Sequence, residues 1–336
     1  MIMLLKTSDL KLVLEMKLTT VGDPHLKPDN LDKAEKLFSI VEELGHTTMW
    51  LGDLLDTKEI VRSKCLNLLY RSFKKSRLQH VILVGNHDYH SLSCEDHSLA
   101  VLKELPNVDV IDSTSRFTLA SGGVALIPFH SDLTKFRNEL KTVKDSRLLI
   151  MHQGVNGFDY GNGYIADNEI SIDELNSFEL VISGHFHKYQ KKSNLVYLGT
   201  PFSHSFGESD QEKFIGVLDT NTLSLDLTPT QFPKHRTLHL TVPVEDMSKV
   251  DHTLKNSCDK WRVILEGKQE DISKFDKSEF PTIKFIEKPT SDFITGSLIS
   301  EAESHELKFA KWAKDIKQLD KKTTNLGLEI LREQMQ

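Results

Sequence analysis

Residues 81–88 read VILVGNHD, an apolar and largely β-branched run that stops at a glycine followed by three polar residues. The run predicts a short buried strand, and Gly85-Asn86 predicts a turn, because both residues tolerate left-handed backbone conformations. Four other apolar runs also stop at turn or ligand-type residues. Polar residues gathered where strands end predict a layered α/β domain with a ligand site at that edge. The other runs are Leu18–Val21, Thr47–Leu51, Leu148–Met151 and Leu180–Ile182.

The chain length and the rhythm of its elements predict more than one domain. Its 336 residues exceed the ~250–300 at which one core usually stops growing. Strands alternate with helices over residues 16–232, and apolar spacing predicts helices at Leu31–Leu44 and Arg62–Phe73. Residues 233–289 predict a second, smaller α/β unit, and residues 290–336 a polar linker and a C-terminal helical segment. The second unit's expected elements are the strands Thr237–Val242, Trp261–Leu265 and Thr282–Ile286 and the helices Glu245–Lys255 and Gln269–Phe280.

An excess of acidic residues limits how the chain can bind nucleic acid. It has 42 Lys plus Arg against 49 Asp plus Glu, a formal charge of −7. Diffuse attraction of the whole molecule to DNA or to an anionic membrane is therefore excluded. Local basic patches, bound cations or a partner would have to supply any DNA binding.

The cysteines and the apolar runs indicate the compartment. Cys65, Cys94 and Cys258 are odd in number and far apart, which predicts neither a disulfide framework nor a thiolate zinc site. The longest apolar runs fall short of the ~18 residues needed to cross a bilayer, and residues 1–15 do not form a signal-peptide core. We expect a soluble protein of a reducing, cytoplasmic compartment without a membrane partner.

Five short motifs place carboxylate, amide or imidazole groups directly after predicted strands. Two divalent ions ~3.5–4 Å apart need a bridging carboxylate and several oxygen or imidazole ligands, which this set supplies. Asp53 is the expected bridge. Asp23, His25 and His187 would complete one ion, and Asn86, His152 and His185 the other. The motifs are Asp23-Pro24-His25, Gly52-Asp53-Leu54-Leu55-Asp56, Gly85-Asn86-His87-Asp88, His152-Gln153-Gly154 and Gly184-His185-Phe186-His187.

The spacing of His185 and His187 requires a loop. Side chains alternate along a regular strand, so these two histidines would point to opposite faces of one. They can share a site only if the strand ends before them. Gly184 favours a turn at that point, because glycine adopts conformations that other residues avoid.

Each motif has a simpler explanation when it is taken alone. An isolated Asp-x-His is usually a turn or a surface pair, with odds of roughly one in ten of binding a metal. Gly-Asn-His-Asp suits an ordinary turn, and His152 suits a hydrogen-bonded, partly buried histidine. These explanations do not account for five such motifs in succession, each after an apolar run. The metal-site hypothesis is therefore preferred.

Taken together, the five motifs resemble the signature of the calcineurin-like metallophosphoesterases over residues 17–232. Within that superfamily, the chain resembles SbcD-type nuclease subunits of the double-strand-break repair complex. The resemblance lies in Leu198–Pro201, Phe206–Glu208 and the strand Phe214–Leu218. Phage-encoded recombination nucleases of this type have a similar length. The resemblance implies a two-sheet α/β sandwich with the metals at one edge, followed by a small α/β DNA-capping domain at 233–289.

The resemblance also implies a role for each residue. The activity would be a two-metal, manganese-dependent DNA phosphodiesterase, an exonuclease or endonuclease. The seven residues named above match the family's metal ligands. His87 matches the family's histidine that acts beside the scissile phosphate, and Asp56 and Asp88 would orient His25 or His87.

The resemblance implies two partners, DNA and an SbcC-type coiled-coil ATPase. The basic residues Lys188, Lys191 and Lys192 follow the last metal motif and are candidates for phosphate contacts, whereas the cluster from Arg71 to Arg77 reads better as a solvated face. Glu301–Asp320 would dock the ATPase through its apolar stripe. That stripe consists of Phe309, Trp312, Ile316 and Leu319 and has packing on its own domain as the alternative. A homodimer is compatible with this reading, as is the host cytoplasm for a phage protein.

Two other functions remain open at this stage. The first is a phosphomonoesterase of the same superfamily that acts on a small molecule or a phosphoprotein. The second is a non-catalytic scaffold on the same fold, which the complete ligand set argues against.

Overall fold

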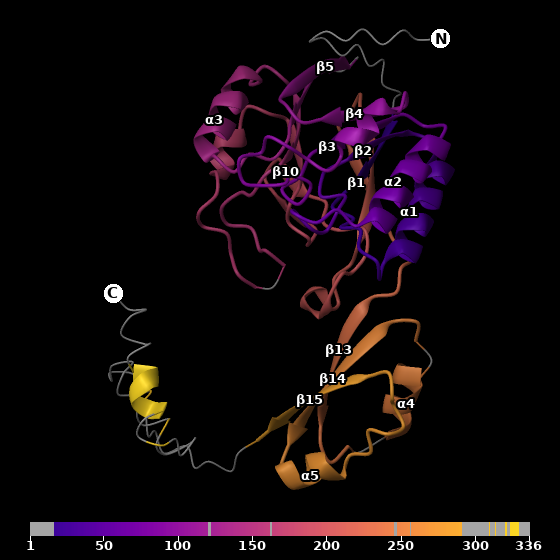
Figure 1. Ribbon diagram of the computed structural model, residues 1–336, viewed down its shortest axis with the longest axis vertical. Helices are drawn as coiled ribbons and strands as arrows, with labels where there is room; N and C mark the ends of the chain where they lie inside the picture. Colours follow the sequence, from indigo (N-terminus) through magenta and orange to yellow (C-terminus); the bar gives the residue numbers. More distant parts are fainter. Residues whose placement is uncertain are drawn as a thin grey trace. The chain divides into compact units, whose positions relative to one another are not determined.

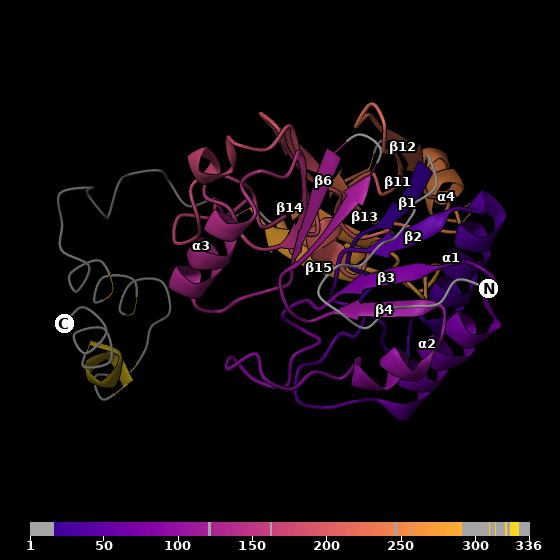
Figure 2. The ribbon, with the colours of Figure 1, turned by 90° about the horizontal axis from the view of Figure 1, so that it is seen from above.

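The computed structural model describes residues 17–119, 122–161, 163–244, 247–255 and 257–290, together with 309, 313, 320 and 323–328. The chain divides into two compact units. One consists of residues 1–239, 245–264 and 277–286, and the other of 240–244, 265–276 and 287–336. The larger unit contains two six-stranded sheets (Figures 1 and 2).

The first sheet has the strand order β12-β11-β1-β2-β3-β4. Its four strands β1 to β4 are parallel, whereas β11 runs antiparallel to β1. The carboxyl ends of β1, β2 and β3 therefore meet at one edge, and the motifs that begin at Asp23, Gly52 and Gly85 follow them. The strands are β1 (Lys17–Val21), β2 (Thr47–Trp50), β3 (His80–Leu83), β4 (Val108–Ile111), β11 (Phe214–Asp219) and β12 (Leu225–Pro229).

The second sheet has the order β5-β6-β7-β8-β10-β9. Its central strands β6, β7, β8 and β10 are parallel. The two edge strands β5 and β9 are antiparallel to their neighbours. The strands are β5 (Ser115–Leu119), β6 (Gly122–Ile127), β7 (Leu148–His152), β8 (Leu180–Gly184), β9 (Gln190–Lys192) and β10 (Leu195–Tyr197).

The alternation of side chains in β2 shows how the layers form. Met49 packs in the core between the two sheets, with Val81 and Ile150. Its neighbour Trp50 points to the opposite face, as the period of two requires, and its ring lies 5.0 Å from that of Phe38. That outer face is covered by α1 (Leu31–Leu44) and α2 (Ser63–Lys75).

The outer face of the second sheet is covered by α3 (Leu133–Thr142), whose Phe136 and Leu140 pack on residues of β6 and β7. In Figure 2, α1 and α2 lie on the side of β1–β4, and α3 lies beyond β6. The larger unit is therefore a helix–sheet–sheet–helix sandwich, which confirms the expected two-sheet α/β fold. Three short 3₁₀ helices complete it: η1 (Ala100–Glu104), η2 (Ile172–Leu175) and η3 (Phe206–Glu208).

The third sheet has the order β13-β14-β15 and is accompanied by α4 and α5. The expected strand–helix–strand–helix–strand order is confirmed here, but the predicted helix Gln269–Phe280 is wrong in length, because α5 ends at Lys274. Residues 276–279 are all polar, so a continued helix would have no apolar side chain to bury between Phe275 and the buried Phe280. The elements are β13 (His235–Thr241), α4 (Met247–Lys255), β14 (Lys260–Gly267), α5 (Gln269–Lys274) and β15 (Lys284–Pro289).

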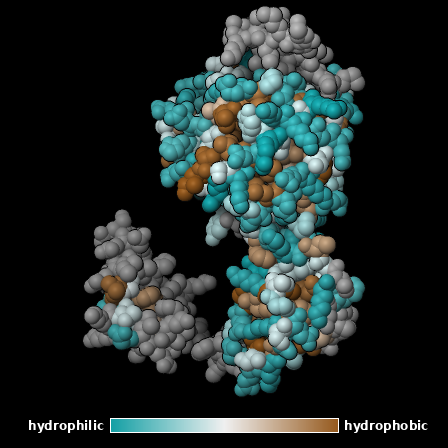
Figure 3. All heavy atoms as spheres, turned by 45° about the vertical axis from the view of Figure 1, so that its right-hand side comes forward, coloured by the Kyte–Doolittle hydropathy of each residue, from teal (hydrophilic) through white to brown (hydrophobic). Residues whose placement is uncertain are grey.

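Hydropathy varies over one face of the described residues. Figure 3 shows hydrophilic residues over most of the described face in view, with smaller apolar groups between them. Within the described residues, no helix is both long enough and apolar enough to span a membrane.

Candidate metal centre

The loops after β1 and β2 run side by side, which brings the first two motifs together. Leu26 and Leu55 form an isolated parallel bridge beyond the ends of the strands. The backbone N–H of His25 donates to the carbonyl oxygen of Asp53 at 3.0 Å. The continued pairing places Asp23, His25 and Asp53 at one edge, and all three side chains are buried.

The second sheet contributes the remaining histidines at the same edge. His152 is the last residue of β7 and pairs in register with Gly184, the last residue of β8. Across the sandwich, Nδ1 of His152 donates to the carbonyl oxygen of Leu51 at 2.7 Å. This hydrogen bond fixes the proton on Nδ1 and leaves Nε2 as the nitrogen that can bind a cation.

Asp53 lies between two groups of ligand-type side chains. Its Oδ2 is 3.6 Å from Nε2 of His25 and 3.4 Å from Nε2 of His152. On one side, the ring of His187 lies 4.7 Å from that of His25. This arrangement is the one that a carboxylate shared by two cations requires.

On the other side, Asn86 holds the second group together. Its Oδ1 lies 3.0 Å from Nε2 of His152 and 2.7 Å from Nδ1 of His185. Asp23 connects the two groups, because its Oδ2 accepts the backbone N–H of His185 at 2.9 Å and its Oδ1 lies 3.6 Å from Nδ1 of His152. The structure thus brings all seven predicted ligands together, and their division between two ions stays a prediction.

Backbone strain is concentrated at this edge. His25, Asp53 and His185 have φ of 40°, 49° and 91°, three of the seven non-glycine residues with positive φ in the described chain. Such conformations persist where the surroundings enforce them, most often at functional sites. The turn after β8 therefore falls on His185 and not on Gly184. Gly184 is needed for a close approach instead, because a Cβ there would come within 2.5 Å of Oδ1 of Asp23.

The main chain holds His87 at the same edge. Nδ1 of His87 donates to the carbonyl oxygen of Asp56 at 2.7 Å, which leaves Nε2 as the second ring nitrogen. The carboxylate of Asp56 is 3.9 Å from Nδ1 of His25. Asp88 accepts the N–H groups of Gly85 at 3.0 Å and Leu55 at 3.1 Å, so it joins the two ligand loops through their backbones.

Burial governs the protonation of this centre. Burial raises the pKa of Asp23 to about 7. Burial and the nearby Asp53 raise that of Asp88 to about 8. Burial also lowers the pKa of His185 to about 3 and that of His25 well below its usual range. Both imidazoles are therefore neutral, the form that binds metals.

Asp53 and His152 carry opposite charges that stabilise each other. Burial favours the neutral acid at Asp53, but the charge and hydrogen bond of His152, with His25 and His87, hold its pKa well below the usual range. Burial opposes the charged form of His152 as well, but Asp53 and Asp23 raise its pKa to about 9.

Unsatisfied atoms test whether a cation fits here. Oδ1 of Asp23 and both ring nitrogens of His25 are buried without a hydrogen-bond partner. Buried polar atoms without partners are rare and need an explanation, such as a bound ion. His25, Asp53 and His87 each offer a ligand atom, and the three atoms lie within 4.8 Å of one another. The residues present therefore fit divalent cations.

His204 is a further residue at this centre and was not anticipated from the sequence. Its ring lies 5.5 Å from that of His25 and 6.0 Å from that of His187, and both ring nitrogens are buried without partners. Burial lowers the pKa of His204 to about 3. In the sequence, His204 stands out only by its position between the motifs Leu198–Pro201 and Phe206–Glu208. A single histidine in a loop does not predict a functional site.

The three lysines proposed for DNA differ in their environments. Lys188 pairs with Asp159 at 2.9 Å and lines a cavity of 700 Å³ that Asp210 and Glu212 also line. Lys192 donates to the carbonyl oxygen of Gly157 and lies 4.8 Å from the ring centroid of Phe158. Lys191 is exposed on β9. Acidic neighbours therefore offset the charge of Lys188, and DNA contacts by this cluster stay a prediction.

The predicted docking stripe falls almost entirely outside the described residues. Of its four members the structure describes Phe309, whereas Trp312, Ile316 and Leu319 lie outside the described ranges. Phe309 lies close to Gly327, because a Cβ at Gly327 would come within 2.4 Å of its ring.

Known proteins resemble this chain. The calcineurin-like phosphoesterase family model matches residues 16–189. "Exonuclease subunit 1" of Enterobacteria phage T4 is 26% identical over 242 residues, which cover 67% of this chain and 70% of that protein. Protein 244L of Invertebrate iridescent virus 6, whose name describes it as a phosphoesterase, is 27% identical over 285 residues, or 78% of this chain and 98% of that protein. The structure of an archaeal phosphodiesterase aligns with 64% of this chain and 100% of its own at 15% identity and a TM-score of 0.36.

Proposed function

Because the chain belongs to the calcineurin-like phosphoesterase family, and is thereby a hydrolase of phosphate esters, we propose that it is a two-metal phosphodiesterase that cleaves DNA. The observation that carries the proposal is the position of Asp53 between His25 and His152, at 3.6 and 3.4 Å, within a set of seven ligand-type side chains of which four are buried. The likeness to an exonuclease subunit of phage T4 supports DNA as the substrate.

The cations would be held by the two groups that Asp53 separates. Asp23, His25, Asp53 and His187 would hold one, and Asn86, His152, His185 and Asp53 the other. When bound, divalent cations activate water and neutralise charge on the phosphate. The mixed oxygen and imidazole set suits manganese among other divalent metals, and Mn²⁺ is the metal we propose.

The chain's own residues would then position the phosphate ester and manage its protons. His87 is held through Nδ1 by the carbonyl of Asp56, so Nε2 is the ring atom that would meet the leaving oxygen. Asp88 holds Gly85 and Leu55 together, which keeps the ring of His87 beside the ligands. A correctly placed general acid or base typically contributes ~10²–10⁴-fold to rate.

We place this activity in a complex of the SbcCD type, working in DNA repair or recombination in the cytoplasm, the host cytoplasm for a phage protein. The relative in phage T4 is named as a subunit, which supports a partner. The partner would be a coiled-coil ATPase that binds the C-terminal segment. Lys188, Lys191 and Lys192 would contact the phosphates of the DNA, and a homodimer is compatible with this assembly.

A phosphomonoesterase is the second candidate. The iridescent virus relative, named as a phosphoesterase without a substrate, matches this chain over 98% of its own length. A scaffold without activity is disfavoured, because all seven ligand-type residues are present and adjacent.

One assay separates these candidates. The purified chain is supplied with Mn²⁺ and offered linear duplex DNA, bis-p-nitrophenyl phosphate as a diester and p-nitrophenyl phosphate as a monoester. The proposal expects cleavage of DNA and of the diester, and loss of both in Asp53→Asn. Preferential turnover of the monoester supports the second candidate, and no turnover of any substrate supports the scaffold.

A further inference from the structure

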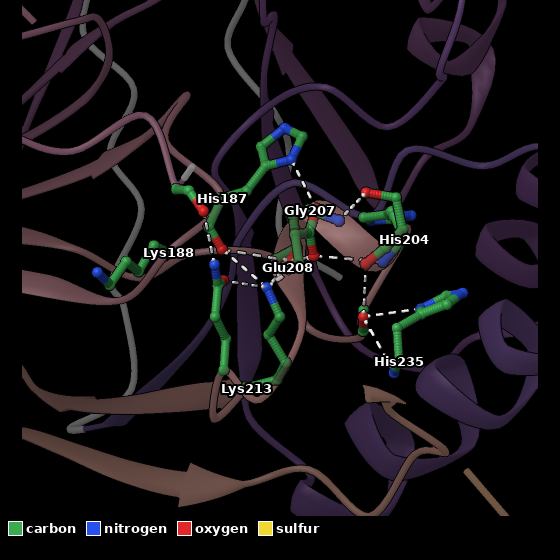
Figure 4. A network of polar contacts seen from close by, with 12 residues as sticks. His187, Lys188, His204, Gly207, Glu208, Lys213 and His235 are labelled. Atoms are coloured by element: carbon green, nitrogen blue, oxygen red, sulfur yellow. Dashed lines mark hydrogen bonds and ion pairs between the residues drawn. The ribbon is translucent and has the colours of Figure 1, made fainter. Parts of the chain in front are cut away.

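Glu208 is a buried carboxylate in η3 that the mechanism above does not use; it is 6% exposed. Its Oε1 accepts a hydrogen bond from Nδ1 of His187 at 2.9 Å, and its Oε2 lies 2.8 Å from Nζ of Lys213 (Figure 4). A carboxylate acceptor fixes the proton of His187 on Nδ1. Nε2 of His187 is then the nitrogen that carries the free lone pair.

Lys213 is as deeply buried as Glu208, at 2% exposure, and its ammonium group is fully engaged. Besides pairing with Glu208, Nζ donates to the carbonyl oxygen of His187 at 3.0 Å and to Oγ1 of Thr200 at 2.7 Å. One lysine therefore contacts the backbone of His187 as well as the carboxylate that holds its ring. A histidine held at both ends has little freedom to turn.

The same carboxylate also fixes the neighbouring loop. Oε2 of Glu208 accepts the backbone N–H of His204 at 3.2 Å and the hydroxyl of Thr200 at 3.3 Å. Figure 4 shows Glu208 between the residues that it joins, His187, His204 and Lys213. The contacts place Glu208 at the centre of a polar network that ends on a proposed metal ligand.

We propose that Glu208 and Lys213 are positioning residues for His187, which fix its tautomer and present Nε2 to a divalent cation. This inference rests on the metal centre of the proposed function. A carboxylate that receives the second ring proton of a metal-binding histidine typically changes metal affinity ~10–100-fold when it is removed. Lys213 balances the charge of Glu208, which would otherwise be buried without a counter-ion.

The test measures binding of Mn²⁺ alone to metal-stripped protein by titration calorimetry. Glu208→Ala should weaken one of two binding steps by ~10–100-fold. Glu208→Gln should recover part of the affinity, because its side-chain carbonyl can still accept the proton of His187. Glu174→Ala is the matched control: it removes an ion pair with Arg137 at 2.9 Å, away from the site, and should bind Mn²⁺ as the wild type does.

A double-mutant cycle distinguishes positioning from a general structural role. If Glu208 acts through His187, then adding Glu208→Gln or Glu208→Ala to His187→Ala should cost no further affinity, whereas independent effects would add. Thermal melts of the metal-free variants show which of them fold. If Glu208→Ala does not fold, the affinity measurement and the cycle are carried out with Glu208→Gln alone. Wild-type Mn²⁺ affinity in a folded Glu208 variant, or additivity in the cycle, overturns the inference. Wild-type protein that binds two Mn²⁺ but leaves DNA intact would overturn the nuclease proposal alone.

Discussion

Oδ1 of Asp53 accepts the main-chain N–H of His87 at 2.7 Å. The carboxylate proposed to bridge two cations therefore also holds the loop that carries the proposed catalytic histidine. Its other oxygen, Oδ2, remains toward His25 and His152. The charge of Asp53 and its structural hydrogen bond can be separated, because asparagine keeps one carbonyl oxygen to accept the N–H of His87, while an uncharged NH2 group replaces the second oxygen.

Asp53→Asn should consequently fold but lose Mn²⁺ at one or both positions. Loss of cation stabilisation worth several kcal/mol corresponds to about 10³-fold or more in rate, so hydrolysis should fall below detection. Metal analysis of the purified variant and a cleavage assay check both effects. Asp226→Asn, on the exposed face of β12, is the control and should retain metal and activity. A variant without bound metal but with full activity would contradict the two-metal mechanism.

His87→Ala should keep both cations and lose turnover. Nδ1 of His87 is occupied by the carbonyl of Asp56, and our assignment reserves Nε2 for the phosphate ester. The rate should fall by ~10²–10⁴-fold with little change in metal content. The proximity of His25, Asp53 and His87 makes the metal analysis decisive. Loss of a cation from this variant would make His87 a ligand.

A pH dependence of stability is expected from His80, far from the metal chemistry. His80 is fully buried, accepts a hydrogen bond from Nε1 of Trp50 at 3.3 Å, and lies 2.7 Å from the hydroxyl of Ser76. Burial lowers its pKa to about 4, against about 6.5 in the unfolded chain. The neutral, buried form of His80 therefore contributes fully to stability above about pH 6.5. As the pH falls toward 4 the free energy of unfolding decreases, by roughly 2 kcal/mol at pH 5.

His80→Gln should reduce that dependence, because glutamine does not titrate and still offers an acceptor to Trp50. Unfolding by urea at pH 7 and pH 5 measures the difference. The wild type should lose more stability than the variant on acidification, and His90→Gln, at an exposed residue, should behave as the wild type does. An equal loss in wild type and His80→Gln would show that His80 does not control this transition.

The motifs at strand ends could be predicted from sequence because two simple rules act together. Apolar runs form buried strands, and parallel strands deliver the residues after their carboxyl ends to one edge. The helix predicted at 31–44 was confirmed to the residue. The strands β4, β5, β6, β9, β10 and β12 were not predicted; several are short or carry polar residues on one face.

The supporting residues of the site could not be predicted for a different reason. Glu208 lies in a single 3₁₀ turn and His204 in the loop before it. In neither place does a periodicity indicate which way a side chain points. The contact between Glu208 and His187 joins residues 21 positions apart. It depends on how two loops fold against each other. Conversely, the turn expected at Gly184 falls on His185, since the glycine's space is needed by Asp23.

The C-terminal segment beyond Ser300 should be dispensable for cleavage itself. Truncation after Ser300 should leave Mn²⁺-dependent cleavage near normal, because every proposed ligand precedes residue 188. It should abolish stimulation by the coiled-coil ATPase. Within the segment, Phe309 lies close to Gly327, and Asp320 caps the helical residues 323–328 through the N–H of Thr323 at 3.0 Å.

The alternative is that the apolar stripe belongs to the core of its own domain. Removing it would then expose apolar surface at a cost of ~1.5–3 kcal/mol for each large side chain, a substantial part of the free energy of unfolding of a typical domain. The truncated chain would melt markedly earlier. A thermal melt, performed beside a pull-down with the co-expressed ATPase, separates the two: docking predicts an unchanged melt with lost binding, and early melting with binding retained contradicts it.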